Sequence, residues 1–126
     1  MQISLSDGEW KLMKVLWDEP PYTITQLVKR LSEETGWSKN TIITMLGRME
    51  KKGAIYYEEG KKAKEFYPKV SQEEVTIEET KGFLDKVYNG SVSLLINTMV
   101  NNSSISKTEI EELYEILKKA EGDDHA

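Results

Sequence analysis

Polar side chains recur at helical spacing between residues 40 and 51. Asn40, Thr44, Arg48 and Lys51 follow one another at intervals of four, four and three residues, which places them on one face of an α-helix. No carboxylate interrupts that face, so it offers hydrogen-bond donors and positive charge. An arginine fork suits guanine, an asparagine amide suits adenine, and threonine suits several base edges. The pattern predicts a helix that reads bases in a DNA major groove through Asn40, Thr41, Thr44 and Arg48.

Lysines accompany this face and return in a short turn farther along the chain. An ammonium group beside a phosphate supplies affinity without sequence preference. Any solvent-exposed helix shows a polar face, and the lysine-bearing turn is what favours nucleic acid over that simpler interpretation. The expected phosphate contacts are Lys39, Lys51, Lys52, Lys61, Lys62 and Lys64.

The sequence offers little to an enzyme or to a metal site. It has no cysteine and a single histidine, His125, so thiolate nucleophiles, thiolate metal ligands and histidine clusters are excluded. Glu111 and Glu115 lie one helical turn apart, but their pattern is typical of a solvated helix face. Phosphate-binding glycine loops and nucleophile-elbow motifs are also missing. We therefore expect no catalysis, no metal and no cofactor.

Helix-start signals predict three helices in the first part of the chain. Residues 6–9 and 23–26 are capping boxes, and Ser38 caps a third helix that ends at Gly53. Two strand-like segments follow, joined by the lysine-bearing turn. This order is that of a winged helix-turn-helix. We therefore expect a mainly α fold with a small β-hairpin wing, and assign residues 1–70 to a DNA-binding domain.

Charge is segregated along the chain. The total of −5 is atypical of nucleic-acid binders, which are usually basic. Residues 1–70 hold 12 Lys and Arg against 10 Asp and Glu, whereas residues 71–126 hold 5 against 12. Within the first part, residues 39–69 hold 8 basic and 4 acidic side chains. The distribution indicates a basic reading edge and a separate acidic module.

Residues 71–126 are expected to form an α-helical dimerisation domain. Their 56 residues are too few for a core of their own, yet they carry three apolar patches at helical spacing. A second copy would cover those patches and set two recognition helices about 34–36 Å apart. The alternative is that these helices fold back onto the N-terminal domain of their own chain. The expected dimer contacts are Phe83, Leu84, Val87, Tyr88, Leu94, Leu95, Ile110, Leu113, Tyr114 and Leu117.

The chain carries no signal for a membrane. No apolar run approaches the ~20 residues that span a bilayer, and residues 1–7 lack the basic and apolar regions of a signal peptide. The absence of cysteine agrees with a reducing compartment. We expect a cytoplasmic protein without membrane insertion.

The ordered motifs resemble the penicillinase repressor (BlaI/MecI) family of winged-helix transcriptional regulators. The resemblance extends over nearly the whole chain, and blocks in a fixed order are more specific than a lone helix-turn-helix. These blocks are residues 6–17, 38–55, 83–90 and 109–113, with Thr41, Thr44, Arg48, Lys52 and Gly53 matching the family pattern in the second.

The resemblance implies a homodimeric repressor on a dyad operator of β-lactamase or related antibiotic-resistance genes. In the family, a membrane sensor detects a β-lactam, and the repressor is then cleaved at an Asn-Phe bond in its dimerisation region. The corresponding bond here is Asn97-Thr98, which departs from that pattern and leaves induction by cleavage open. Asn40 and Ile43 stand where family members often carry basic residues, so the operator preference is expected to differ. The lack of cysteine excludes the cysteine cluster of related copper-responsive repressors.

Two other functions are compatible with the residues. A winged helix can serve as a protein-interaction module, with the acidic helical half as its binding surface. A repressor of similar fold could also answer another signal. Retention on DNA that falls steeply with salt distinguishes a DNA-binding protein from an interaction module.

Overall fold

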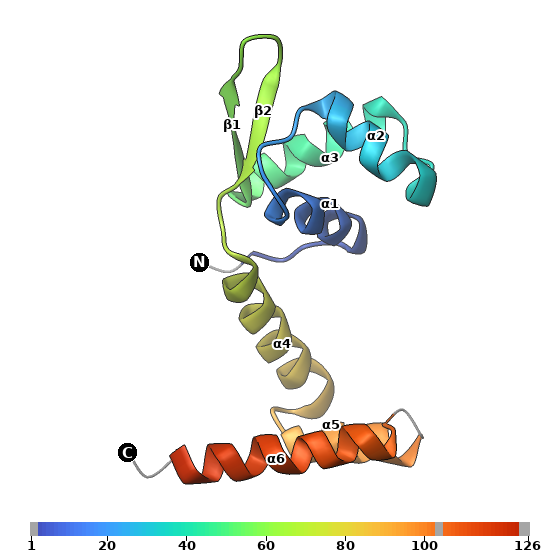
Figure 1. Ribbon diagram of the computed structural model, residues 1–126, viewed down its shortest axis with the longest axis vertical. Coiled ribbons are helices and arrows are strands. Elements are labelled where there is room, and N and C mark those ends of the chain that lie inside the picture. The colour runs from blue at the N-terminus through green and yellow to red at the C-terminus, as the bar shows by residue number, and fades with distance from the viewer. Residues whose placement is uncertain (1–2, 103–104, 124–126) are drawn as a thin grey trace. The chain divides into compact units, whose positions relative to one another are not determined.

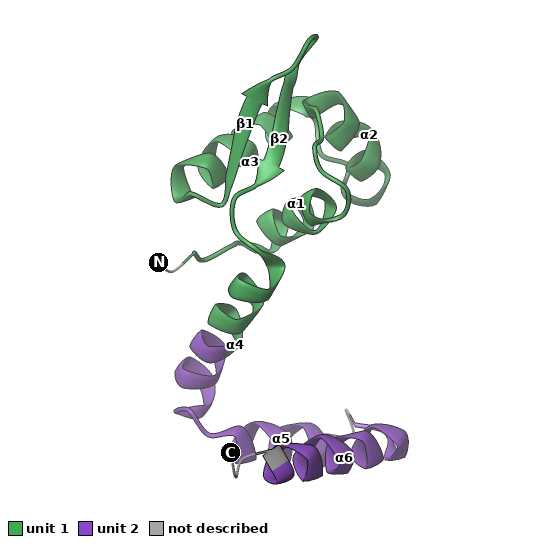
Figure 2. Cartoon of the chain, turned by 60° about the vertical axis from the view of Figure 1, so that its left-hand side comes forward, with its two compact units in different colours: residues 1–80 green, residues 81–126 purple. Residues whose placement is uncertain are grey.

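The chain forms six helices and one β-hairpin over the residues that the computed structural model describes, 3–102 and 105–123 (Figure 1). This confirms the mainly α fold with a β-hairpin wing. The chain divides into two compact units, residues 1–80 and 81–126 (Figure 2). The elements are α1 (Asp7–Trp17), α2 (Ile24–Thr35), α3 (Lys39–Lys52), β1 (Ile55–Glu59), β2 (Lys64–Pro68), α4 (Gln72–Tyr88), α5 (Val92–Asn101) and α6 (Lys107–Asp123).

The helix starts predicted from the sequence are confirmed by their caps. At α1, the Ser6 hydroxyl accepts from the Glu9 amide at 3.2 Å, and the Glu9 carboxylate accepts from the Ser6 amide at 2.9 Å. Thr23 and Gln26 repeat this exchange at the start of α2. These side chains satisfy amides that have no partner within the helix. Gly53 ends α3 with a φ of 82°, a left-handed conformation that favours glycine.

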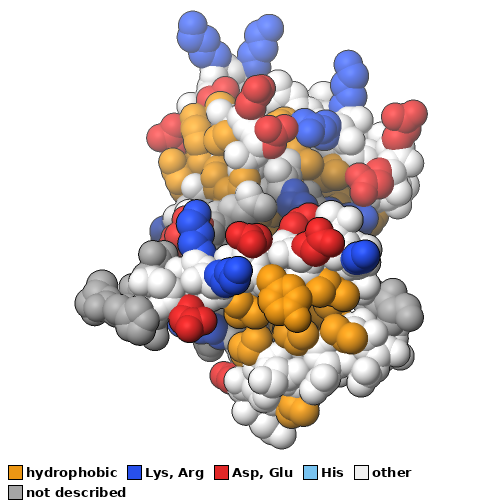
Figure 3. Space-filling model, turned by 60° about the horizontal axis from the view of Figure 1, so that its bottom comes forward, with side chains coloured by type: hydrophobic (Ala, Val, Ile, Leu, Met, Phe, Trp, Pro, Cys, Tyr) orange, Lys and Arg blue, Asp and Glu red, His pale blue; other side chains and the backbone are white. Residues whose placement is uncertain are grey.

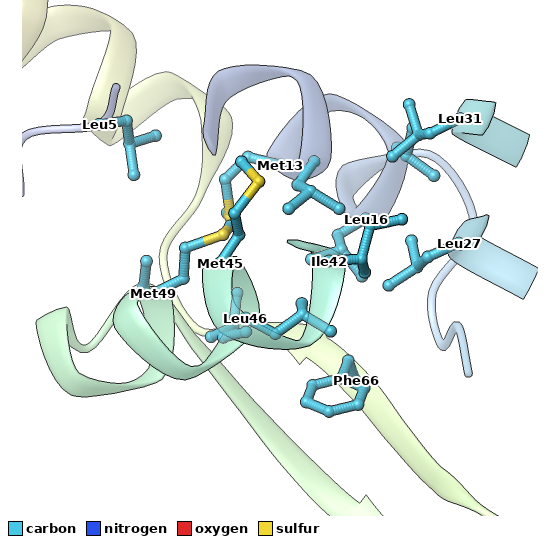
Figure 4. Packing of buried hydrophobic residues seen from close by; sticks show 14 of the residues in the cluster. Leu5, Met13, Leu16, Leu27, Leu31, Ile42, Met45, Leu46, Met49 and Phe66 are labelled. Carbon is cyan, nitrogen blue, oxygen red and sulfur yellow. The ribbon is translucent and has the colours of Figure 1, made fainter. Parts of the chain in front are cut away.

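One apolar cluster lies between α1, α2, α3 and the hairpin (Figure 4). Val75, in the first turn of α4, is buried and belongs to the same cluster, so the start of α4 is part of the first unit. Burial of this apolar surface is the main force that fixes the orientation of α3 within the first unit. The helical contributors are Leu12, Met13 and Leu16 from α1, Leu27 and Leu31 from α2, and Ile42, Met45, Leu46 and Met49 from α3.

The wing is an antiparallel hairpin anchored on the segment between α1 and α2. Tyr56 pairs with Tyr67, and Tyr57 pairs with Phe66. Strand β2 also bonds outside the hairpin, because the Phe66 amide donates to the Tyr22 carbonyl at 2.8 Å and its carbonyl accepts from the Tyr22 amide at 3.2 Å. A two-stranded hairpin is marginal alone. Tyr22 and the core contact of Phe66 therefore supply the support that the wing requires.

The second unit contains the rest of α4 together with α5 and α6. None of its described side chains, over residues 81–102 and 105–122, is buried. Apolar side chains lie on its surface instead, and Figure 3 shows them gathered on one face. This unit has helices but no closed core of its own.

Candidate nucleic-acid interface

Helix α3 separates an apolar face from a polar face. The side chains of Asn40, Thr44, Arg48 and Lys51 are all exposed on the side opposite the core. Lys39, at the first position of the helix, is exposed as well. The apolar face packs into the core through Ile42, Met45, Leu46 and Met49.

The polar side chains of this face have few partners inside the protein. Within the described part of the chain, Asn40, Thr44 and Arg48 make no side-chain hydrogen bond or ion pair. Thr41 differs, because its amide donates to the Ser38 hydroxyl at 3.2 Å and its own hydroxyl lies 3.1 Å from that oxygen. Thr41 thus stabilises the first turn of α3, whereas the other three side chains are available to a ligand.

Lys52, the last residue of α3, lies in a different environment from the other lysines. Its ammonium group donates to the Ser4 carbonyl at 2.8 Å and forms an ion pair with the buried carboxylate of Glu9. Burial raises the pKa of Glu9, but the Lys52 hydrogen bond and charge and the Ser6 amide outweigh it and hold the pKa below its ordinary value. The ammonium group of Lys52 is thus engaged in holding α3 against α1, which makes it less available to a phosphate than the ammonium groups of the exposed lysines.

An N-terminal strap, residues 3–6, joins the end of α3 to the middle of α4. The amides of Ile3 and Leu5 donate to the carboxylates of Glu78 and Glu79, each at 3.2 Å. Alternate residues of an extended segment point their backbone groups to opposite sides, and the Ser4 carbonyl accordingly accepts from Lys52. Sequence reasoning missed this strap, although alternating apolar and polar residues at its positions were a usable signal.

The wing turn carries two exposed lysines, Lys61 and Lys62. The Gly60 amide donates to the Ala63 carbonyl at 2.9 Å and closes the turn. A Cβ at Gly60 would lie 2.6 Å from that carbonyl oxygen, so the turn requires glycine at this position. Lys64 instead lies over the ring of Tyr57, with 4.2 Å between its ammonium nitrogen and the ring centroid.

The residues expected at a dimer interface lie in the second unit, and most are exposed. Tyr114 and Leu117 are 66 % and 62 % exposed. The neighbouring Ile116 is 61 % exposed and was not among the expected contacts, although its position on the same helix was a usable signal. Phe83, Val87, Leu94 and Ile110 are exposed, whereas Leu84, Tyr88, Leu95 and Leu113 are half-buried.

The candidate cleavage bond, Asn97-Thr98, lies inside helix α5. The Thr98 hydroxyl donates to the Leu94 carbonyl at 3.1 Å, and the Thr98 carbonyl accepts from the Asn102 side chain at 2.8 Å. A protease requires extended backbone at its scissile bond. Cleavage at this bond would thus require α5 to unwind locally.

Residues 3–102 and 105–123 contain no group of three or more His, Asp or Glu side chains that could hold a metal ion. In the same ranges, no helix combines the length and the apolar character needed to cross a membrane. The polar face of α3 and the wing turn remain the candidate interface.

Comparison with protein families gives one matching model, described as penicillinase repressor, over residues 5–119. A penicillinase repressor of Bacillus licheniformis is 32 % identical over 115 residues, covering 91 % of this chain and 90 % of the relative. The methicillin resistance regulatory protein MecI of Mammaliicoccus sciuri is 30 % identical over 115 residues, covering 91 % of this chain and 94 % of the relative.

Solved structures agree with the winged-helix fold. The Bacillus licheniformis BlaI monomeric form, in complex with the blaP half-operator, matches with a TM-score of 0.52 and 32 % identity. The match covers 57 % of this chain and 88 % of the BlaI chain. A mutant MarR from E. coli matches with a TM-score of 0.53 over 93 % of this chain and 78 % of its own, but at 18 % identity it supports the fold alone.

Proposed function

The chain belongs to the penicillinase repressor family, and from this membership we propose that it is a homodimeric transcriptional repressor of a dyad operator. The genes under its control are β-lactamase or related resistance genes, as the names of its relatives suggest. It acts in the cytoplasm, where the operator lies. The single observation that carries DNA binding is the exposed, acid-free face of α3, on which Asn40, Thr44 and Arg48 have no side-chain partner in the described chain.

Base reading is assigned to α3 lying in the major groove. Arg48 supplies two parallel donors for guanine, and Asn40 supplies the donor and acceptor that adenine requires. Thr44 offers a hydroxyl to several base edges or a methyl group to thymine. Thr41 contributes at the edge of the face, in competition with its contact to Ser38. The buried apolar face of the helix fixes the direction in which these side chains point.

Phosphate binding is assigned to lysines at both ends of the candidate interface. Lys39 and Lys51 flank the base readers on α3, and Lys61 and Lys62 extend from the wing turn. Their contacts fix the register of the protein on DNA but carry no sequence information. Lys64 contributes less, because its ammonium group already lies over Tyr57.

A dimer is proposed because the described residues of the second unit form no buried core. No described side chain of residues 81–102 and 105–122 is buried, and large apolar side chains lie on its surface. A second copy of the same surface would cover them through a two-fold interface. The same axis would place two recognition helices about 34–36 Å apart, one turn of DNA.

We propose that a pathway of membrane sensor and protease releases the protein from DNA, as the resemblance to the family implies. The helical setting of Asn97-Thr98 argues for a step that unwinds α5 before cleavage at that bond. Incubation with the sensor's protease, followed by mass analysis of the fragments, locates the cut. Fragments that end elsewhere would remove this bond from the proposal.

Arg48 provides a direct test of base reading. Arg48→Lys keeps the positive charge but loses the planar fork, so it should retain binding to random DNA and lose preference at one base pair. Lys118→Arg on α6 is the matched control, because it exchanges the same two residue types outside the interface. Affinities for the selected operator and its single-base variants provide the measurement. Unchanged discrimination in the Arg48 variant would contradict the assignment.

A further inference from the structure

Ile43 is the large apolar side chain of α3 that lies outside the core. It is 41 % exposed, whereas the four core side chains of the same helix are at most 6 % exposed. Isoleucine is also a slightly unfavourable residue in a helix, because its branched Cβ restricts rotamers. Neither core packing nor helix propensity therefore explains an isoleucine at this position.

Gly47 lies one helical turn after Ile43. Its backbone is helical, and it is not among the glycines of positive φ. A Cβ built at Gly47 would meet no atom within 4 Å beyond its own helix and its chain neighbours. Glycine inside a helix lowers stability relative to alanine. The fold thus has room for a side chain at Gly47 and would gain stability from one.

Ile43 and Gly47 form a methyl notch on the base-reading face of α3. Residues four apart on a helix are neighbours, so the aliphatic side chain of Ile43 borders the bare backbone at Gly47. Asn40 precedes Ile43 by three residues, and Thr44 precedes Gly47 by three, so two proposed base readers flank the notch. The Ile43 side chain and the bare backbone at Gly47 therefore form an apolar patch among hydrogen-bonding groups, with the exposed Glu50 three residues after Gly47.

We propose that the methyl notch contacts the C5-methyl group of a thymine in each operator half-site. Thymine is the natural DNA base that presents a methyl group in the major groove, and apolar side chains are its partners there. Arg48 and Asn40 suit guanine and adenine, and the notch supplies an apolar contact that neither of these two side chains offers. Gly47 lets the base edge approach the helix backbone. This inference rests on the proposed function and specifies one of its contacts.

The first experiment removes only the methyl group from DNA. The probe is a duplex that the full chain selects from random DNA, with each thymine replaced singly by deoxyuridine. Loss of one buried methyl contact should lower the affinity of the natural chain about fourfold at one position in each half-site. Ile43→Ala should bind the unmodified duplex more weakly and show no further loss with deoxyuridine at that position.

The second experiment fills the notch. Gly47→Ala should raise the midpoint of chemical denaturation, because alanine favours helix. It should also lower operator affinity about fourfold or more, because the added methyl group blocks the approach of the thymine. Gly82→Ala is the matched control, since Gly82 is also helical and has no atom within 4 Å of a built Cβ. The control should raise stability and leave operator affinity unchanged.

The outcomes separate this inference from the proposed function. A chain that selects no DNA site overturns the proposed function. If the chain selects a site but no single deoxyuridine replacement changes its affinity more than twofold, the thymine contact of the methyl notch is overturned and the proposed function stands. If Ile43→Ala keeps the full deoxyuridine effect, another side chain such as Thr44 reads the methyl group and the inference fails. Equal loss of affinity in both glycine variants also overturns it.

Discussion

The ammonium group of Lys52 binds the carboxylate of Glu9, a side chain that is 2 % exposed, and so ties the last turn of α3 to the first turn of α1. The Ser6 amide donates to the same carboxylate at 2.9 Å. A buried carboxylate is stable only where such partners replace its lost hydration. This cluster, together with the core face of α3, orients the recognition helix within the first unit.

Removing Lys52 should destabilise the protein through the carboxylate that it leaves behind. Lys52→Met is expected to lower the free energy of unfolding by about 2–4 kcal/mol, somewhat below the range for fully buried pairs. The expected loss is smaller than for a fully buried pair because the side chain of Lys52 is partly exposed. The double variant Glu9→Gln with Lys52→Met should recover part of that loss, because the buried charge is then absent. Urea denaturation of the set provides the measurement, and a single variant within about 0.5 kcal/mol of the natural chain would contradict the account.

The same pair should make stability depend on pH in the acid range. The folded state holds the pKa of Glu9 below its ordinary value of 4.5. The unfolded chain therefore takes up the proton first, and the stabilisation is fully present above that value and is lost as the pH falls through the folded pKa. The difference in unfolding free energy between the natural chain and Glu9→Gln should shrink as the pH is lowered from about 6 to about 3. A constant difference would mean that the charge of Glu9 does not stabilise the fold.

A wing lysine should affect affinity without affecting sequence preference. Lys61→Ala is expected to weaken binding to all DNA sequences alike and to reduce the slope of log affinity against log salt by about one unit. Lys119→Ala on α6 is the control, because it removes the same charge outside the candidate interface and should leave the slope unchanged. Titrations at several salt concentrations decide the matter. A slope equal to that of the natural chain would remove Lys61 from the phosphate contacts.

A charge on the exposed apolar face of the second unit should prevent dimerisation. Leu117→Glu is expected to sediment as a monomer at micromolar concentration, since a buried unpaired carboxylate opposes association. Lys118→Glu introduces the same side chain at the next residue and should leave the dimer intact. A natural chain that itself sediments as a monomer at this concentration would contradict the dimer.

Local sequence signals predicted the elements of this fold because they act over short distances along the chain. The capping pairs Ser6 with Glu9 and Thr23 with Gln26 are three residues apart. The apolar stripe of α3 likewise repeats every three or four residues, which identified both its core face and its exposed reading face.

Contacts between distant residues could not be predicted in the same way. Lys52 lies 43 residues from Glu9, and Ile3 lies 75 residues from Glu78. Charge alone made Lys52 equivalent to Lys51, although one is engaged in an ion pair and the other is exposed. The sequence signals of the hairpin likewise did not predict the pairing of β2 with Tyr22, which lies between α1 and α2.

The most direct test of the central claim is selection of bound sites by the full chain from random-sequence duplexes, followed by sequencing. The account predicts a dyad whose half-sites are one helical turn apart, about 34–36 Å between centres, with a guanine and an adenine in each half-site. Recovery of no enriched sequence, or of single half-sites without a fixed partner, would contradict a dimeric repressor that reads DNA through α3.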